Sequence, residues 1–213
     1  MPDEAPDWEG WHRAYDDPSS YLSRRLEKVQ RHLRLAVEGK PGRLQMVSMC
    51  AGQGRDVIGA LANHPRRAEI DARLVELDAG NVELGRAGVR ATGLEGIEVV
   101  CADAGASDSY AGAVPADIIL ACGVFGNISD GDVRRTIEYL PHLSAPGAVV
   151  IWTRGREAER DFTLTIRGWF AEVGFEELGF EAPSDARFRV GVHRLVREPR
   201  PFQPEVRLFS FLR

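Results

Sequence analysis

Residues 47–57, VSMCAGQGRDV, decide how the rest of the chain is interpreted. They begin inside an apolar run, 44–50, which is typical of a strand that is buried on both faces. The run ends at Gly52 and Gly54, and the pattern that follows predicts a helix over 54–63. Glycine at the end of a strand allows a tight turn and lets a ligand approach without meeting a Cβ atom, while the helix N-terminus offers unpaired N–H groups. On their own, the two glycines fit a ligand site and an ordinary turn equally well.

Strand-like and helix-like segments alternate along most of the chain. The apolar patterns predict strands at 44–50, 72–78, 96–102, 116–122 and 148–154. They predict helices at 20–38, 54–63, 79–92, 130–143 and 159–173, with a short helical or irregular piece at 107–112. Ser19 or Ser20 is expected to cap the first helix, and Ser129 with Asp132 resembles a capping box. Five strand–helix units in succession predict an α/β, doubly wound, mostly parallel sheet.

The segment after Gly174 has a different pattern. FEELGFEA, RFRVGVHRLV and EVRLFSFL are typical of three strands with little helix between them. Short connections suit antiparallel pairing, since parallel crossovers need a dozen residues or more. We therefore expect an antiparallel edge on the C-terminal side of the sheet.

Composition indicates one globular domain of 213 residues with a net charge of −5. The acidic balance argues against a nucleic-acid partner, which usually meets a basic surface. Cys50, Cys101 and Cys122 are odd in number and lack CxxC spacing, so we expect neither disulfides nor a metal site. The N-terminus lacks an apolar core and no apolar stretch approaches about 20 residues, so we expect no membrane partner and a cytoplasmic location.

Two further strand ends carry acids. Glu76 ends the second predicted strand, with Asp78 two residues on, and an acid there can accept hydrogen bonds from both hydroxyls of a ribose. Glu76 follows Gly52 by 24 residues, close to the interval of about 20 expected for this role. Asp103 follows the third strand, where its carboxylate can accept from an adenine amino group. Glu76 or Asp103 alone also fits a helix cap or a solvated side chain, but the order of the glycines and these two acids along the chain predicts an adenosine pocket.

The dinucleotide fingerprint G-x-G-x-x-G is incomplete here, because Val57 stands at the third glycine position. The sequence instead resembles the class I S-adenosylmethionine-dependent methyltransferases over roughly 44–154. VSMCAGQGRDV is similar to their first motif and LVELDAGNVELGRAGVRATGL to their second. VVCADA is similar to the third-strand segment. ADIILACGVFGNISDGDVRRTIEYLPHLSAPGAVVIW resembles the fourth strand, its loop, the next helix and the turn before strand five.

This resemblance implies S-adenosylmethionine as cofactor and a Rossmann-like, seven-stranded sheet with an antiparallel C-terminal edge. It implies a single domain, with an N-terminal arm and lid helix at 1–40 and the cofactor-binding part at 41–213. Two departures stand out, because Ser48 replaces the usual acid and Cys50 the first glycine. By resemblance the cofactor site comprises Tyr15, Arg24, Ser48, Cys50, Ala51, Gly52, Gly54, Glu76, Leu77, Asp103, Ala104, Gly123 and Phe125. Of these, Tyr15 and Arg24 would reach the methionine carboxylate.

The acceptor side is less constrained. Phe125 and Asn127 follow the fourth strand, where Phe125 would wall off the site and Asn127 would orient the acceptor; a core residue and a turn residue are the alternatives. By resemblance, His12 would line the acceptor pocket together with Trp11, although simple packing is an alternative for Trp11. His193 is a second possible base, or else a structural histidine. We therefore expect methyl transfer to a small molecule at an O, N or C atom, by a monomer or a homodimer.

Three alternatives to this reading stay open. One is a nicotinamide-dependent oxidoreductase, which the missing third glycine disfavours. Another is a non-catalytic protein that binds S-adenosylmethionine, which the departures at Ser48 and Cys50 would fit. The last is methylation of a protein side chain.

Overall fold

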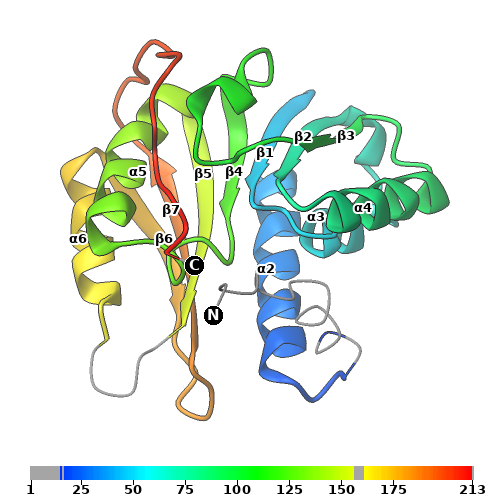
Figure 1. Ribbon diagram of the computed structural model, residues 1–213, viewed down its shortest axis with the longest axis horizontal. Coiled ribbons are helices and arrows are strands. Elements are labelled where there is room, and N and C mark those ends of the chain that lie inside the picture. The colour runs from blue at the N-terminus through cyan, green and yellow to red at the C-terminus, as the bar shows by residue number, and fades with distance from the viewer. Residues whose placement is uncertain (1–14, 16, 156–160, 213) are drawn as a thin grey trace, which may run out of the picture.

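The computed structural model describes residues 15, 17–155 and 161–212. Its strands are β1 Leu44–Met49, β2 Ile70–Glu76, β3 Ile97–Cys101, β4 Ala116–Ala121, β5 Ser144–Gly155, β6 Phe175–Glu181 and β7 Phe188–Leu195. Its α-helices are α2 Tyr21–Glu38, α3 Arg55–Leu61, α4 Ala79–Thr92, α5 Asp130–Leu143 and α6 Thr163–Glu172. Two 3₁₀ helices, η2 Arg67–Glu69 and η3 Ser107–Tyr110, complete the elements (Figure 1).

The strands form one seven-stranded sheet in the order β3-β2-β1-β4-β5-β7-β6. Strands β1 to β5 pair in parallel, whereas β7 is antiparallel to both β5 and β6. This confirms the Rossmann-like, mostly parallel sheet with an antiparallel C-terminal part. The strand order reverses between β1 and β4, and ligands in such sheets bind beyond the carboxyl ends of the strands at that point.

Helices cover both faces of the sheet, with α2, α3 and α4 on one face and α5 and α6 on the other (Figure 1). Successive side chains of a strand point to opposite faces. In β1, Met46 accordingly belongs to the core that contains Leu33 of α2, while Val47 belongs to the core that contains Ile137 of α5. Each face of the sheet therefore has its own apolar core, which helices cover. This confirms the prediction of a doubly wound sheet.

The observed helix caps agree closely with those predicted from the sequence. The Ser20 hydroxyl accepts from the Ser23 N–H at the start of α2, and the Ser129 hydroxyl accepts from the Asp132 N–H at the start of α5. Asp78 caps α4, since its side chain accepts from the Asn81 N–H. This capping role of Asp78 was not predicted from the sequence.

The structure differs from the expected elements in two places. The third predicted strand of the tail is absent among the described residues, where that segment makes only isolated bridges, Ala106 with Arg207 and Ile128 with Phe211. Strand β5 begins at Ser144, before the predicted start at 148, because Ser144 pairs with Ala116 of β4. A register shift follows this pair, so that the next residues to pair are Ile118 and Val149.

Helix α2, predicted as part of a lid, is a layer of the core. Val29, Leu33 and Val37 are all at most 2% exposed and pack toward the sheet. Its other contribution is one wall of the cavity described below, through Leu26 and Val29. In the described part of the chain, no helix combines the length and the apolar character needed to cross a membrane.

Candidate active site

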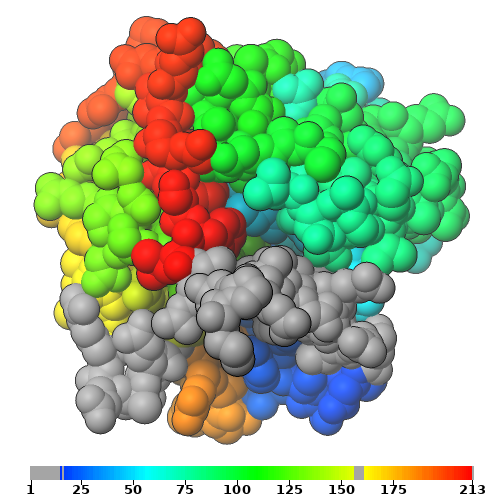
Figure 2. All heavy atoms as spheres, in the orientation of Figure 1, coloured from blue at the N-terminus to red at the C-terminus, as the bar shows by residue number. Residues whose placement is uncertain are grey.

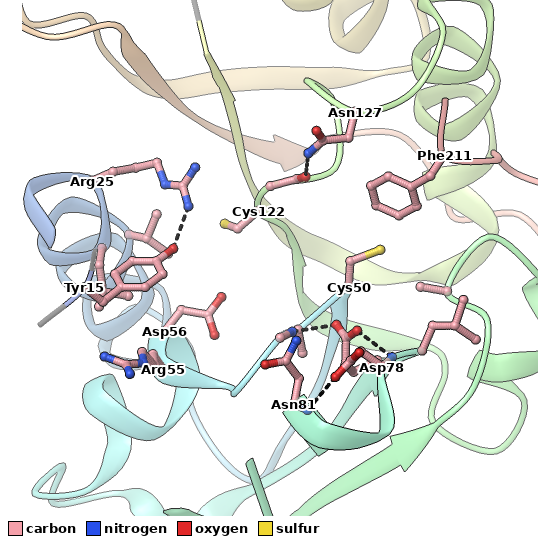
Figure 3. A pocket seen from close by; sticks show the side chains of 18 of the residues that line it. Tyr15, Arg25, Cys50, Arg55, Asp56, Asp78, Asn81, Cys122, Asn127 and Phe211 are labelled. Carbon is pink, nitrogen blue, oxygen red and sulfur yellow. Dashed lines mark hydrogen bonds between the residues drawn. The ribbon is translucent and has the colours of Figure 1, made fainter. Parts of the chain in front are cut away.

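A cavity of about 530 Å³ lies at the carboxyl ends of β1, β2, β3 and β4, where the strand order reverses (Figure 3). It is lined by Tyr15, Arg25, Leu26, Val29, Cys50, Ala51, Gly52, Arg55, Asp56, Glu76, Leu77, Asp78, Ala79, Asn81, Asp103, Ala104, Cys122, Gly123, Asn127 and Phe211. This size is typical of a pocket for a drug-sized ligand.

Glu76, the last residue of β2, joins two loops of the cavity. One carboxylate oxygen accepts from the Gly52 N–H at 2.8 Å, and the other accepts from the Asp78 N–H at 2.9 Å. Gly52 has a φ of 56°, a left-handed conformation that glycine adopts without strain. A carboxylate has about four lone-pair positions. Glu76 can therefore hold both loops and still accept hydrogen bonds from a ligand.

The end of β3 adds a second carboxylate and an apolar patch. Asp103 accepts from the Gly105 N–H at 2.8 Å through one oxygen and from the Arg207 guanidinium at 2.5 Å through the other. Ala104 is buried, whereas the Leu77 residue that also lines the cavity is 66% exposed. An exposed leucine beside a cavity is a surface that a flat, apolar ligand group can cover.

Charged groups from α2 and α3 form another end of the cavity. Arg25 donates to the Tyr15 hydroxyl at 2.7 Å, and the Arg55 guanidinium lies 5.4 Å from the centre of the Tyr15 ring. Asp56, in the first turn of α3, is buried, and loss of solvation raises the pKa of its carboxyl. Figure 3 shows Tyr15, Arg25 and Asp56 on the opposite side of the cavity from Phe211.

The loop after β4 closes the remaining side. Asn127 donates from its side-chain amide to the Gly123 carbonyl at 2.6 Å, and the Gly123 N–H donates to the Thr153 hydroxyl at 2.9 Å. Gly123 has a φ of 78°, and a Cβ added there would meet no atom within 4 Å. The loop is therefore held in place by hydrogen bonds while its glycine leaves room on the cavity side.

The two cysteines of the cavity are neutral thiols. Burial raises the pKa of Cys50 well above its usual range, and the nearby carboxylates of Glu76 and Asp103 raise it further. Burial likewise raises the pKa of Cys122, with a smaller contribution from Asp56. Since the thiolate is the reactive form, neither side chain is suited to act as a nucleophile.

A family model described as "Putative methyltransferase" matches residues 20–156. The chain belongs to this methyltransferase family. The match confirms the prediction of an S-adenosylmethionine-dependent methyltransferase that was made from the strand-end motifs. A comparison with curated proteins found no match.

Solved structures with the same fold include several methyltransferases. One is magnesium protoporphyrin IX methyltransferase from Synechocystis PCC 6803 with bound S-adenosylmethionine, at 13% identity and a TM-score of 0.67, covering 90% of this chain and 92% of that one. A methyltransferase from Aquifex aeolicus gives 15% identity and a TM-score of 0.62, covering 91% of this chain and 100% of that one.

An O-methyltransferase family protein from Burkholderia thailandensis gives 14% identity and a TM-score of 0.66, covering 84% of this chain. The present methyltransferase spans only 57% of the length of that protein. At these identities the likeness shows the shared fold.

Most of the predicted cofactor residues of this methyltransferase, and one of its predicted catalytic residues, Asn127, come together in the cavity. The structure places there Tyr15, Cys50, Ala51, Gly52, Glu76, Leu77, Asp103, Ala104, Gly123 and Asn127. Among the described residues it does not bring in Arg24, Ser48, Gly54, Phe125 or His193. His12 and the neighbouring Trp11 lie outside the described residues.

Arg24 points away from the cavity and pairs with Asp185 at 2.9 Å on the surface. The next residue, Arg25, lines the cavity instead of Arg24, because one step along an α-helix turns a side chain by about 100°. Phe125 is fully buried and packs against Trp152, with ring centres 5.9 Å apart, so the core alternative holds.

Ser48 and Gly54 lie close along the chain to residues that line the cavity but do not line it themselves. Ser48 is 1% exposed within β1, and its hydroxyl has no hydrogen-bond partner among the described residues. Gly54 is the N-cap of α3 with a φ of 69°, and a Cβ there would lie 2.7 Å from a methyl group of Leu74. Gly54 therefore allows close packing of α3 on the sheet.

His193 is a core residue of β7. Its ring stacks on Phe170 at 4.3 Å and accepts a hydrogen bond from the Trp152 indole N–H at 3.1 Å. It is 1% exposed, and burial lowers its pKa to about 4. The prediction of a catalytic base at His193 is wrong, because the ring is enclosed among aromatic side chains away from the cavity.

The buried imidazole predicts a dependence of stability on pH. The unfolded chain binds a proton at His193 near pH 6.5, while the folded chain does so only near pH 4. The unfolded state therefore binds more protons in this window, and stability falls as the pH drops, by about 3 kcal/mol at most. Denaturant unfolding of the wild type and His193→Asn between pH 7 and 4 would measure it. The variant keeps an acceptor for Trp152 and should lose this part of the pH dependence; identical slopes would contradict it.

Several cavity residues were not predicted from the sequence. Asp56 follows Gly54 by two residues in the first helical turn, a position that could have been read as facing a ligand. Arg25 differs from the predicted Arg24 only in helical phase. No local motif marks Phe211, which reaches the cavity only because a distant part of the chain folds back over it.

Proposed function

We propose that this methyltransferase transfers the methyl group of S-adenosylmethionine to a small-molecule acceptor within the cavity. One observation carries the placement of the cofactor: the Glu76 carboxylate is held between the Gly52 and Asp78 amides in the same cavity as Asp103. Carboxylates at adjacent strand ends suit the ribose hydroxyls and the adenine amino group.

The cavity fits an adenosine group in shape as well as in polarity. Leu77 and Ala104 provide apolar contact for a base, and Glu76 provides the acceptor for a ribose. At Gly123 the missing Cβ leaves open space on the cavity side. The residues present therefore support binding of the cofactor without rearrangement of these loops.

We assign the methionine end to the side of Arg25. Its guanidinium is positioned by the Tyr15 hydroxyl and lines the cavity, so it can donate hydrogen bonds to a carboxylate. Arg24, its neighbour on the surface, serves as a matched control because its partner is Asp185.

We expect Arg25→Ala to weaken binding of S-adenosylhomocysteine by roughly 10- to 100-fold, as for loss of a charge-assisted hydrogen bond. Arg24→Ala should leave the affinity unchanged. Binding of 5′-methylthioadenosine, which lacks the carboxylate, should be the same for both variants. Isothermal titration calorimetry measures all three, and equal effects of the two substitutions would refute the assignment.

We assign the acceptor side to Asn127 and Asp56, which line the cavity with Cys122 between them in Figure 3. The bound cofactor supplies a methyl group on a sulfonium centre, and the protein has to align the acceptor and exclude water. Asp56 is a buried carboxyl with raised pKa, placed to accept a hydrogen bond from an N–H or O–H of the acceptor. Asn127 holds Gly123 and thereby fixes the shape of this wall.

Two features favour a small molecule as the acceptor. The cavity of about 530 Å³ has to contain both the cofactor and the reacting part of the acceptor. The net charge of −5 disfavours a polyanionic partner such as RNA or DNA.

The first experiment is a parallel calorimetric titration with S-adenosylmethionine, S-adenosylhomocysteine and NADH. Micromolar binding of the first two with no binding of the third supports the proposal. Methyl transfer from labelled S-adenosylmethionine is then measured with amine, phenol and carboxylate acceptors, and with protein and tRNA as separate arms. Transfer to protein or tRNA alone would refute the small-molecule part, while binding without any transfer would indicate a non-catalytic member.

We also propose a cytoplasmic location. Cys50, Cys101 and Cys122 are all free thiols, which suits a reducing compartment. Cell fractionation with a tagged protein tests this directly.

A further inference from the structure

The segment 203–212, which we call the strap, follows β7 and crosses the carboxyl ends of the strands. Figure 2 shows it in red, running across this face of the molecule between the α5 side and the segment that follows β3. Its only β-bridges in the described part of the chain are the two isolated ones at Arg207 and Phe211, and further hydrogen bonds attach it on either side. An extended segment in this position lies directly over a ligand site of this fold.

The strap is fixed firmly on the β3 side. The Ser107 N–H donates to the Val206 carbonyl and the Val206 N–H to the Ser107 hydroxyl, both at 2.9 Å. The Leu208 N–H donates to the Gly105 carbonyl at 2.7 Å. Leu208 and Phe209 are at most 1% exposed and belong to the core, so this part of the strap is an integral part of the fold.

On the β4 side, the strap reaches the wall of the cavity. The Leu212 N–H donates to the Asn127 carbonyl at 3.0 Å. Between the two attachments, the Phe211 ring lines the cavity, as Figure 3 shows, on the same side as Asn127. Phe211 is 38% exposed, and its ring meets that of Phe209 edge to face, with centres 5.9 Å apart. Its position is thus set by a buried neighbour.

The strap also reaches Asp103. Arg207 donates to one oxygen of that carboxylate, and the other oxygen accepts from the Gly105 N–H. Both side chains of the ion pair are about half exposed, at 52% and 45%, so the pair adds little to stability. Its clear effect is to restrict the orientation of a carboxylate that lines the cavity.

We propose that the strap is part of the cofactor site, with Phe211 packing against the adenosine half of the cofactor. Arg207 is a positioning residue that holds the Asp103 carboxylate beside the base. The proposal rests on the proposed function, and adds to it a binding element from far along the chain. An aromatic ring suits this place, because a flat base gains stacking energy on an aromatic face.

The test compares Phe211→Ala with Leu212→Ala. Leu212 is the next residue, is 65% exposed and does not line the cavity, so its truncation removes a similar apolar group outside the site. The affinity for S-adenosylhomocysteine and for 5′-methylthioadenosine is measured by calorimetry for the wild type and both variants. Phe211→Leu, which keeps an apolar side chain without the aromatic face, is a second variant, and melting temperatures verify that each variant is folded.

We expect Phe211→Ala to weaken the binding of both ligands by the same factor, about tenfold. The affinity of Phe211→Leu should lie between those of the wild type and Phe211→Ala, and that of Leu212→Ala should equal that of the wild type. Arg207→Ala should reduce the preference of the protein for S-adenosylhomocysteine over its inosine analogue. If the wild type binds S-adenosylhomocysteine and Phe211→Ala binds it equally well, the inference is wrong while the proposed function stands. Weaker binding of S-adenosylhomocysteine alone would also overturn it, since the contact would then be to the amino-acid half. A wild type that binds neither ligand would overturn the proposed function itself.

Discussion

Replacing Glu76 with alanine is expected to weaken binding of S-adenosylmethionine and S-adenosylhomocysteine by roughly 50- to 150-fold. Loss of a charge-assisted hydrogen bond costs about 1.5–3 kcal/mol. Here the substitution also removes the acceptor of the Gly52 and Asp78 amides, so we expect the upper part of that range. Calorimetric titration of the variant measures the change in affinity directly.

A suitable control for this experiment is Glu83→Ala. Glu83 is an exposed acid on α4 that pairs with Arg86 and does not line the cavity. Glu83→Ala should leave the affinity for both ligands unchanged. Glu76→Gln should fall in between, because an amide keeps one acceptor oxygen for two N–H donors. An unaltered affinity of Glu76→Ala would show that the ribose acceptor lies elsewhere, with Asp78 the next residue to test.

Replacing Gly54 with alanine is expected to destabilise the protein by about 2–5 kcal/mol. The left-handed φ of 69° costs an alanine about 1–2 kcal/mol. In addition, the new Cβ would lie 2.7 Å from a Leu74 methyl group and 3.2 Å from one of Ile58, and such overpacking costs about 1–3 kcal/mol. Chemical denaturation at fixed pH gives the change in the free energy of unfolding.

Gly42→Ala separates the two contributions. Gly42 has a φ of 73°, close to that of Gly54, but a Cβ there would meet nothing within 4 Å. Gly42→Ala should therefore lose only the stability that the left-handed backbone conformation costs an alanine. If both variants lost the same stability, close packing between α3 and β2 would not be the reason for glycine at position 54.

The sequence predicted those parts of the site that depend on neighbours along the chain. Gly52, Glu76 and Asp103 each stand at the end of an apolar strand, and parallel strands bring their carboxyl ends to one edge of the sheet. Once the five strand–helix units are recognised, these residues have to lie close together. The helix caps also depend on neighbours along the chain: Ser129 was predicted directly, and Ser20 as one of two candidates with Ser19.

The remaining parts depend on packing between distant segments. Arg24 and Arg25 are chemically equivalent, and the choice between them depends on which face of α2 packs on the sheet. Phe125 follows a strand as a pocket residue would, but it is drawn into the core by Trp152. His193 stands in a strand whose neighbours across the sheet and in α6 are aromatic, a fact that no local pattern contains.

The hydrogen bonds of Asn127 have a consequence for how new specificities arise in this fold. Its side chain holds Gly123, and its carbonyl accepts from Leu212 of the strap. The loop after β4, which we propose faces the acceptor, and the strap, which we propose contacts the base, are thus joined through one residue. Grafting the loop after β4 from another methyltransferase, to import its substrate range, would break that joint unless residues 203–212 were exchanged with it. The two segments therefore form one structural unit, although some 80 residues of chain separate them.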